Sequence, residues 1–294
     1  MIEDRTLVSR IIDVFIWIIL GLLALSCILP FFHVVAVSLS GRAAVSAKLV
    51  GMLPVNMNFD NYAYILGNSQ FLGSFSISVA RVLVGVVITL LLVAITAYPL
   101  SLDRIRMPGR LAFKIFMLVM LLFSGGLIPT FLAYRSLGLL NNFLVLILPM
   151  ALNVFYTIIM INFFRGIPYE LAEAAWLDGA SHMNVLFRVY LPISLPALAT
   201  IALFTAVSHW NSWFDGIVYI SNIEQWPLQS FLYSLVSTRR IEWQSASGSL
   251  DFQNATPEGL SSALIVVAAV PILMIYPLLQ RYFVTGLTLG SVKQ

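Results

Sequence analysis

Six long apolar stretches dominate the pattern of hydrophobic and polar positions along the chain. An α-helix needs about 20 predominantly apolar residues to cross the hydrocarbon core of a bilayer, and each stretch is close to this length or longer. The stretches are Ile11 to Val37, Val79 to Leu100, Ala112 to Thr130, Leu144 to Phe164, Leu191 to Trp210 and Leu260 to Leu279. The pattern predicts an all-α integral membrane protein with six transmembrane helices.

The composition supports the same class of protein. Of the 294 residues, 60% are hydrophobic and only 10% are charged, whereas about a quarter of the residues of a soluble domain are charged. The first apolar stretch is too long for the core of a signal peptide and follows the acidic residues Glu3 and Asp4, so we expect it to be retained. We therefore expect one transmembrane domain over residues 1–294.

The distribution of Lys and Arg between the loops predicts the orientation. Cytoplasmic loops carry an excess of these residues. The side that holds both termini carries ten of them: Arg5, Arg10, Arg104, Arg106, Arg110, Lys114, Arg165, Arg188, Arg281 and Lys293. The other side carries five: Arg42, Lys48, Arg135, Arg239 and Arg240. Both termini are therefore predicted to be cytoplasmic, with long outer loops at Ser38 to Gly73 and Asn211 to Ser262.

Several classes of function are disfavoured by what the sequence lacks. The net charge is +3, but no run of Lys or Arg exceeds two residues, which argues against a nucleic-acid groove. The single cysteine excludes an internal disulfide, and we find no phosphate-binding GxxxxGK[ST] loop, HExxH or GxSxG motif. We expect no metal site and no catalytic site. No acidic residue lies in the middle of a span, which disfavours a proton- or sodium-coupled carrier.

A polar segment, PYELAEAAWLDGASHMNVLFRVYLP, covers Pro168 to Pro192 between the fourth and fifth spans. Proline suits the first turn of a helix, so a short helix is predicted from Pro168 to Leu177. Asp178 and Gly179 predict a turn with a left-handed residue, and a second short helix follows from Ser181 to Tyr190. The prediction is a helix-turn-helix at the cytoplasmic surface. On spacing alone, an amphipathic helix lying on lipid is an equal alternative.

Two motifs in this segment resemble a known signature. EAAWLDGA, Glu173 to Ala180, followed by VYLP, Val189 to Pro192, resembles the EAA motif of the membrane subunits of bacterial ATP-binding-cassette importers, with Val189 in place of the usual Ile. The resemblance runs from about Asn61 to the end of the chain and is closest to the maltose-type and polysaccharide-type permeases of the carbohydrate-uptake branch. Further similar stretches are SGGLIPTFLAYRSLGLLNN, NFFRGIPYEL, LPALATIALF, HWNSW and LQRYFVTGLTLGSVKQ.

The resemblance implies that the 168–192 segment is a coupling helix seated in a cleft of a cytoplasmic ATPase subunit, with Glu173 as its polar anchor. The residues implied in this contact are Glu170, Glu173, Ala174, Ala175, Asp178, Gly179, Ala180 and Pro192. The C-terminal tail resembles a tail that reaches between two ATPase subunits, which implies contacts by Gly286, Gly290, Lys293 and Gln294. A frayed terminus is the alternative for this tail.

The implied function is that of a multi-pass permease subunit in the bacterial cytoplasmic membrane, which imports an oligosaccharide or polysaccharide fragment. Its implied partners are a second, different permease chain, a dimeric cytoplasmic ATPase and an extracytoplasmic solute-binding protein. ATP and Mg²⁺ would bind to the ATPase, and this chain would bind no cofactor. The alternative is a self-sufficient secondary sugar carrier or channel, which would require intramembrane ionisable groups or an inverted repeat, and neither is visible.

Candidates for a substrate path are the polar and aromatic residues within the spans. Sugars are bound by amide and hydroxyl hydrogen bonds and by aromatic stacking. The candidates are Asn153, Tyr156, Thr157, Ser208, His209, Trp210 and Asn211. Asn and Ser in spans also tie helices together, and Trp favours the membrane interface, so a structural role is the alternative for each. For an acidic sugar, Arg81 would be the only cation near the membrane.

Overall fold

The computed structural model describes residues 7–245 and 256–291. These residues form α-helices, short 3₁₀ and π turns and connecting loops, and no strand occurs among them. The fold is therefore all-α, as predicted. The chain divides into two compact units, Met1–Ser69 with Ser234–Val270 and Gln70–Tyr233 with Pro271–Gln294. The single domain expected over residues 1–294 stays a prediction.

The first unit contains α1 (Leu7–Ser38), a continuous apolar helix that includes the first predicted span and is long and apolar enough to cross a membrane. Two short helices, α2 (Arg42–Ser46) and α3 (Asp60–Gly67), follow it in what the sequence predicts as an outer loop. The end of α1 is tied to this loop, because Asn61 Nδ2 donates a hydrogen bond of 3.0 Å to the Ser38 carbonyl. The loop is thus a folded structure and not an extended connection.

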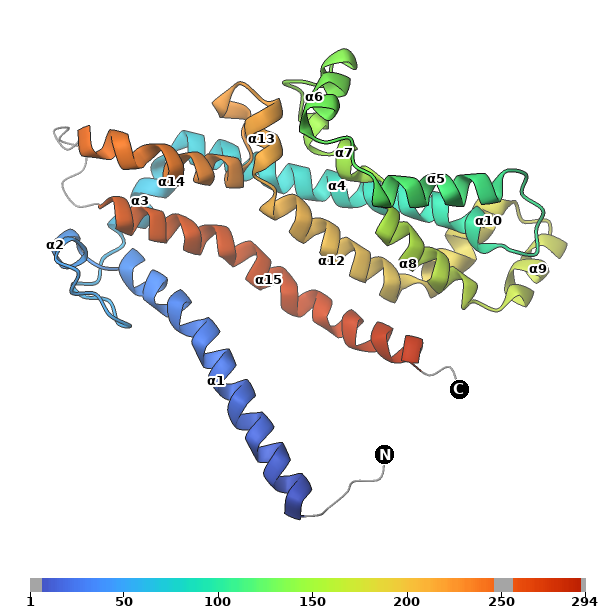
Figure 1. The fold of residues 1–294 in the computed structure, drawn as a ribbon, viewed down its shortest axis with the longest axis horizontal. Coiled ribbons are helices and arrows are strands. Elements are labelled where there is room, and N and C mark those ends of the chain that lie inside the picture. Colours follow the sequence, from blue (N-terminus) through green and yellow to red (C-terminus); the bar gives the residue numbers. More distant parts are fainter. Residues whose placement is uncertain (1–6, 246–255, 292–294) are drawn as a thin grey trace. The chain divides into compact units, whose positions relative to one another are not determined.

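The second unit contains most of the remaining helices, and Figure 1 shows its long helices running beside one another. The 168–192 segment forms one end of this unit, and α13 lies toward the other end. The elements are α4 (Ser69–Ser101), α5 (Arg110–Leu122), α6 (Leu127–Ser136), η1 (Phe143–Leu146), α7 (Leu148–Ala151), α8 (Val154–Arg165), α9 (Tyr169–Leu177), α10 (His182–Val185), η2 (Leu186–Tyr190), α11 (Leu191–Ile193), α12 (Leu195–Asn211), α13 (Phe214–Tyr219) and η3 (Ile223–Gln225). Two further helices run through residues of both units: α14 (Leu228–Ser245) and α15 (Pro257–Ser291).

Three predicted spans are continuous and three are interrupted. The first, second and sixth lie within α1, α4 and α15. The third ends early at Leu122, because a Ser-Gly-Gly sequence follows and Gly126 has a φ of +76°. A helix of 13 residues is about 20 Å long, which is less than the roughly 30 Å of a hydrocarbon core.

The fourth and fifth predicted spans are bent. The fourth bends by 46° between α7 and α8, and α12 leaves the α10–α11 pair at 83°. By length and composition, three described helices could cross a membrane, or five if each bent pair counts as one span. The loop predicted at residues 211–262 is also not simply extended, since it contains α13, η3 and α14, while residues 246–255 lie outside the described part.

One face of α4 is buried along its whole length. The buried positions recur every three or four residues, as the α-helical period requires, and most are small or polar. They include Ser74, Ser78, Arg81, Gly85, Thr89, Val93 and Ala97. Small residues let helices approach closely where the surroundings are apolar. The side chain of His209 on α12 therefore packs directly over Gly85.

Substitution of Gly85 tests this close approach. A Cβ atom at position 85 would lie 2.5 Å from His209 Nε2, whereas a Cβ at Gly73 of the same helix would have no neighbouring atom within 4 Å. We expect Gly85→Ala to cost about 1–3 kcal/mol, as overpacking of a core does. Thermal unfolding in detergent should show a lower midpoint for Gly85→Ala but not for the control Gly73→Ala. Equal midpoints for both variants would contradict the packing.

Candidate functional site

The 168–192 segment folds as the predicted helix-turn-helix. Helix α9 ends at Leu177, and Gly179 follows with a φ of +83°, in the left-handed region that favours glycine. The Ser181 side chain then accepts a hydrogen bond of 3.3 Å from the Asn184 amide and caps α10. A π turn, η2, connects α10 to α11. The local turn chemistry of the sequence therefore sets the shape of this segment.

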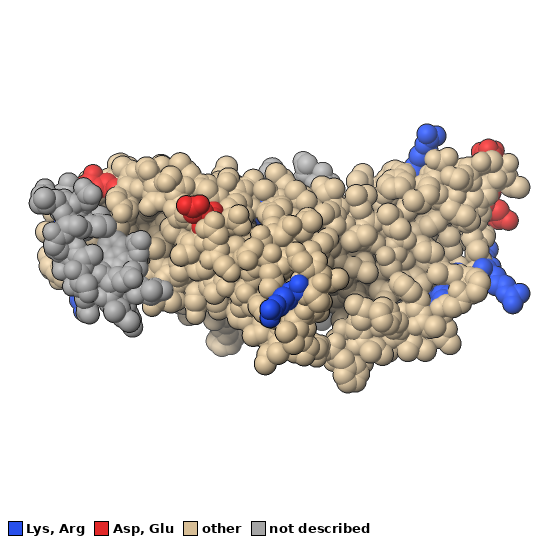
Figure 2. Space-filling view, turned by 90° about the horizontal axis from the view of Figure 1, so that it is seen from above, with Lys and Arg blue, Asp and Glu red and all other residues tan. Residues whose placement is uncertain are grey.

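The two faces of this segment differ in burial. Ala172, Val185, Leu186 and Tyr190 are buried in the core of the second unit. Most of the residues that the sequence implicates in an ATPase contact are exposed: Glu170, Glu173, Ala174, Asp178, Gly179 and Pro192. Ala175 and Ala180 are half-buried. Figure 2 shows charged side chains gathered at this end of the molecule.

An aromatic cluster attaches the inner face of the segment to the end of α4. The ring of Tyr98 on α4 meets Tyr190 edge to face at 5.1 Å, and its hydroxyl lies 3.3 Å from His182 Nδ1. Trp176 packs against the His182 ring at 5.1 Å, and Phe164 packs against Tyr190 at 5.3 Å. Such aromatic pairs contribute about 0.5–1.5 kcal/mol each beyond their buried area. The segment is therefore packed onto a helix far from it in sequence.

The loop between α4 and α5 lies beside the same segment. The Asp103 carboxylate is 2.9 Å from Arg165 on α8 and 3.5 Å from Lys114 on α5. Desolvation raises the pKa of Asp103, but the charges of Arg165 and Lys114 outweigh it and hold the pKa below its ordinary value of 3.8. This ionic contact is therefore present near neutral pH and is lost only as the pH falls through that lowered pKa.

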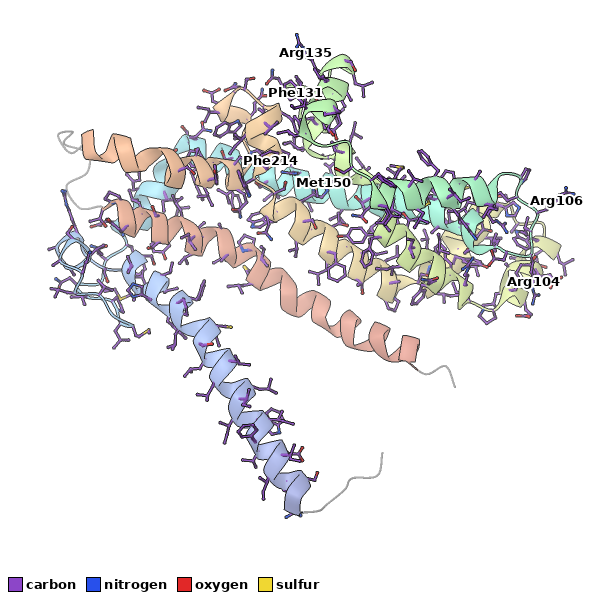
Figure 3. All side chains as sticks on the ribbon, in the orientation of Figure 1. Arg104, Arg106, Phe131, Arg135, Met150 and Phe214 are labelled. Carbon is purple, nitrogen blue, oxygen red and sulfur yellow. The ribbon has the colours of Figure 1, made fainter. Side chains whose placement is uncertain are left out.

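In the N-terminal half of α4, a buried arginine contacts residues of α12 and α13. Arg81 is fully buried and donates hydrogen bonds to both carboxylate oxygens of Asp215, to the Ser212 carbonyl at 3.2 Å and to His209 Nδ1 at 3.3 Å. Its guanidinium also lies 3.9 Å from Met150 Sδ, and Figure 3 labels this methionine beside α4. Asp215 therefore balances the charge of Arg81. The sequence analysis named Arg81 as the only cation near the membrane for an acidic sugar, and the structure pairs its charge with Asp215.

Two partners of Arg81, Ser212 and Asp215, are functional candidates that the sequence reasoning missed. Asp215 accepts further hydrogen bonds from Ser212 Oγ at 3.0 Å and from the Gly216 amide at 2.9 Å. A signal was present, because an arginine within an apolar helix requires an acidic partner. Asp215 follows the fifth apolar stretch closely, but nothing local linked it to a residue 134 positions earlier.

The candidate path residues lie on two helices that contact each other, α8 and α12. Asn153 caps α8 by accepting a hydrogen bond of 3.2 Å from the Tyr156 amide. Thr157 is buried and donates to the Asn153 carbonyl at 2.9 Å. The Tyr156 ring stacks with Phe204 of α12 at 6.3 Å. These contacts serve local structure, and a role in a substrate path stays a prediction for all three candidates on α8.

The candidates at the end of α12 have different environments. His209 and Trp210 are buried, and the Trp210 ring meets Phe75 of α4 edge to face at 5.8 Å. Ser208 is half-buried and Asn211 is exposed. The structure therefore places His209 and Trp210 in the packing between α4 and α12. Asn211 alone among these four presents its side chain openly.

The predicted tail is in part helical. Helix α15 continues to Ser291 and includes Gly286 and Gly290, whereas Lys293 and Gln294 lie outside the described residues. No cluster of three or more His, Cys, Asp or Glu side chains suited to a metal ion occurs within residues 7–245 and 256–291.

The helix-turn-helix and the apolar helices agree with a comparison to known families. Residues 71–288 match the family described as binding-protein-dependent transport system inner membrane component. The chain belongs to this family. It is thus a membrane permease component of an ATP-binding-cassette transporter, and the ATPase of such systems is a separate subunit.

Individual relatives extend over nearly the whole chain. The polygalacturonan/rhamnogalacturonan transport system permease protein YtcP of Bacillus subtilis is 38% identical over 286 residues, which cover 97% of this chain and 99% of that protein. A crystal structure of a bacterial ABC transporter involved in import of the acidic polysaccharide alginate has a chain that is 34% identical, with a TM-score of 0.88 over 96% of this chain and 99% of that one.

A second solved structure shares the fold alone. It is a bacterial alginate ABC transporter in complex with an alginate pentasaccharide-bound periplasmic protein, and its matching chain is 15% identical to this one. The TM-score is 0.52, with 94% of this chain and 93% of that chain covered.

Removal of one partner tests the buried ion pair. Asp215→Asn leaves the Arg81 charge buried without its counter-ion, which typically costs about 3–5 kcal/mol. We expect a lower midpoint of thermal unfolding for Asp215→Asn, and recovery of part of the loss in the double variant Arg81→Leu with Asp215→Leu. The exposed carboxylate variant Glu224→Gln is the control. A midpoint for Asp215→Asn equal to that of Glu224→Gln would contradict the pairing.

Proposed function

We propose that the chain is a permease subunit of an importer that moves an oligosaccharide or polysaccharide fragment into the bacterial cell at the expense of ATP. The similarity to YtcP and to the alginate importer over almost the full length carries this proposal. One relative is named for polygalacturonan and rhamnogalacturonan, and the other imports the acidic polysaccharide alginate. Short oligogalacturonides and alginate oligosaccharides are therefore the first substrates to test.

We further propose six spans in the cytoplasmic membrane with both termini in the cytoplasm. The distribution of Lys and Arg supports this orientation, because the loops on the side of the termini carry ten of these residues against five. The sixth span would be the predicted stretch from Ala112 to Thr130, in which α5 is continued by the residues that follow it, beside the five spans that length and composition support. Its partner in the pore is a different permease chain, and a periplasmic binding protein delivers the sugar.

In this arrangement the exposed face of the 168–192 segment is the contact with a dimeric cytoplasmic ATPase, which holds ATP and Mg²⁺. Glu173 offers a carboxylate to a basic group of the ATPase, and Ala174 lets the two surfaces approach closely. The side chain of Leu177 is 84% exposed and supplies apolar area beside these polar groups. Because α8 leads into the segment and α12 leaves it, movement of the segment moves both helices.

The C-terminal residues belong to the same proposed interface. The end of α15, with Gly286 and Gly290, and the residues Lys293 and Gln294 that follow it would reach between the two ATPase subunits. The sugar path would use the exposed or half-buried candidates Asn153, Tyr156, Ser208 and Asn211. For the buried candidates Thr157, His209 and Trp210, a contact with sugar would require the helices to separate, as alternating access provides.

The decisive experiment measures ATPase activity and sugar uptake of the complex reconstituted in liposomes with its partner permease, its ATPase and its binding protein. Binding protein loaded with one acidic oligosaccharide should stimulate the ATPase of the wild-type complex. Glu173→Lys should reduce this activity to the unstimulated level because it places a cation against the basic group of the ATPase. Glu173→Gln keeps the shape and should retain part of the activity. Stimulation of Glu173→Lys as strong as that of wild type would contradict the proposed contact.

Substitution of Gly179 separates backbone geometry from side-chain contact. No atom lies within 4 Å of a Cβ built at Gly179, but its φ of +83° disfavours a branched side chain. We expect Gly179→Val to distort the turn and to lower stimulated ATPase activity. Asn tolerates left-handed φ, so Gly179→Asn should remain close to wild type. Equal activities of the two variants would show that the turn geometry does not matter.

A further inference from the structure

The loop between α4 and α5 makes two contacts with the 168–192 segment and its lead-in helix. Asp103 lies 2.9 Å from Arg165, the last residue of α8 and four positions before α9 begins. The next residue in the loop, Arg104, places its guanidinium carbon 4.7 Å from the ring centroid of Tyr169, the first residue of α9. Neither contact joins sequence neighbours. The first contact holds the end of α8, and the second the start of α9, against the loop that follows α4.

The loop that makes these contacts is itself held in one shape. Arg110 donates hydrogen bonds to the carbonyls of Leu102 and Ile105 at 2.7 Å each, and to those of Pro99 and Asp103 at 3.3 and 3.2 Å. These carbonyls belong to the end of α4 and to the loop. Arg110 therefore links the loop to α4, and a force on Asp103 or Arg104 reaches that helix.

The connection that runs from α9 to α12 along the chain is bent. Gly179 follows α9 with a φ of +83°, and an 83° bend separates α11 from α12. Displacement of the segment through the chain alone would be absorbed partly at these joints. Helix α4, by contrast, is continuous from Ser69 to Ser101.

We propose that Asp103 and Arg104 form a brace that carries displacement of the 168–192 segment into α4. They are positioning residues and touch neither sugar nor ATP. The inference rests on the proposed function of the segment as the contact with the ATPase. It adds a polar link to α4 beside the aromatic cluster around Tyr98, and so supplements the connections that the chain itself makes from the segment to α8 and α12.

The brace has a consequence in the N-terminal half of α4. Arg81 lies 20 positions before Ser101, the last residue of α4, which corresponds to about 30 Å along the helix. Because Arg81 binds Asp215 and the Ser212 carbonyl, a rigid movement of α4 also pulls on α13. The brace thus connects the ATPase side of the unit with the elements that follow α12.

The test uses a double variant, Asp103→Asn with Arg104→Gln, in the complete reconstituted complex. The control is Arg106→Gln, an exposed arginine in the same loop that Figure 3 shows projecting away from the ribbon. The readouts are assembly, thermal midpoint, ATPase stimulation by loaded binding protein and sugar transported per ATP. Exposed ion pairs contribute little to stability, so the thermal midpoint should not change.

We expect stimulation and sugar transported per ATP to fall at least about fivefold in the double variant, the lower end of typical coupling between sites. Arg106→Gln should behave as wild type, and Asp103→Glu with native Arg104 should retain most of the activity. A double variant equal to wild type would overturn the brace, and so would a loss confined to assembly or thermal stability. If wild type itself shows no stimulation by any loaded binding protein, the proposed function fails instead.

Discussion

Close packing along one face of α4 is the constraint on which the second unit depends. In an apolar environment, burial of hydrophobic surface gives little drive for helices to associate, so contact area and hydrogen bonds must hold them together. Gly85 lets the His209 ring approach the helix axis, and the same face carries Arg81 toward Asp215. Near the C-terminal end of α4, Tyr98 packs against Tyr190 and His182 of the 168–192 segment. One helix therefore organises both ends of the unit.

Features set by local sequence were predictable. The continuous helices α1, α4 and α15 follow from long apolar runs, and the turn at Gly179 follows from an Asp-Gly pair after a short helix. The interruptions were harder to place. The break before Gly126 has a local cause in two consecutive glycines, but the bend at Asn153 depends on a capping side chain within an otherwise apolar run. Apolar length alone could not distinguish a straight span from a bent one.

The candidate site was predictable to a similar extent. The exposed carboxylate of Glu173 lies where the motif implied, on the outer face of α9. The pairing of Arg81 with Asp215 joins positions 134 residues apart, and the pairing of Asp103 with Arg165 joins positions 62 apart. Neither hydrophobic periodicity nor turn residues can predict contacts between residues so far apart in the sequence. His209 and Trp210 show the related difficulty, because the residue types that bind sugars are also those that fill a helix interface.

The π turn at Leu186–Tyr190 explains why the number of residues between Gly179 and Pro192 matters for the structure. A π turn holds one residue more than an α-helical turn, so the side chains beyond it are rotated by about 100° around the helix axis relative to an uninterrupted α-helix. The extra residue places Tyr190 inward, against Tyr98 and Phe164. Deletion of one residue between Gly179 and Pro192 would remove the extra residue of the π turn. The Tyr190 side chain would then point away from Tyr98 and Phe164. The number of residues between Gly179 and Pro192 therefore determines the fold of this segment as much as the residue types do.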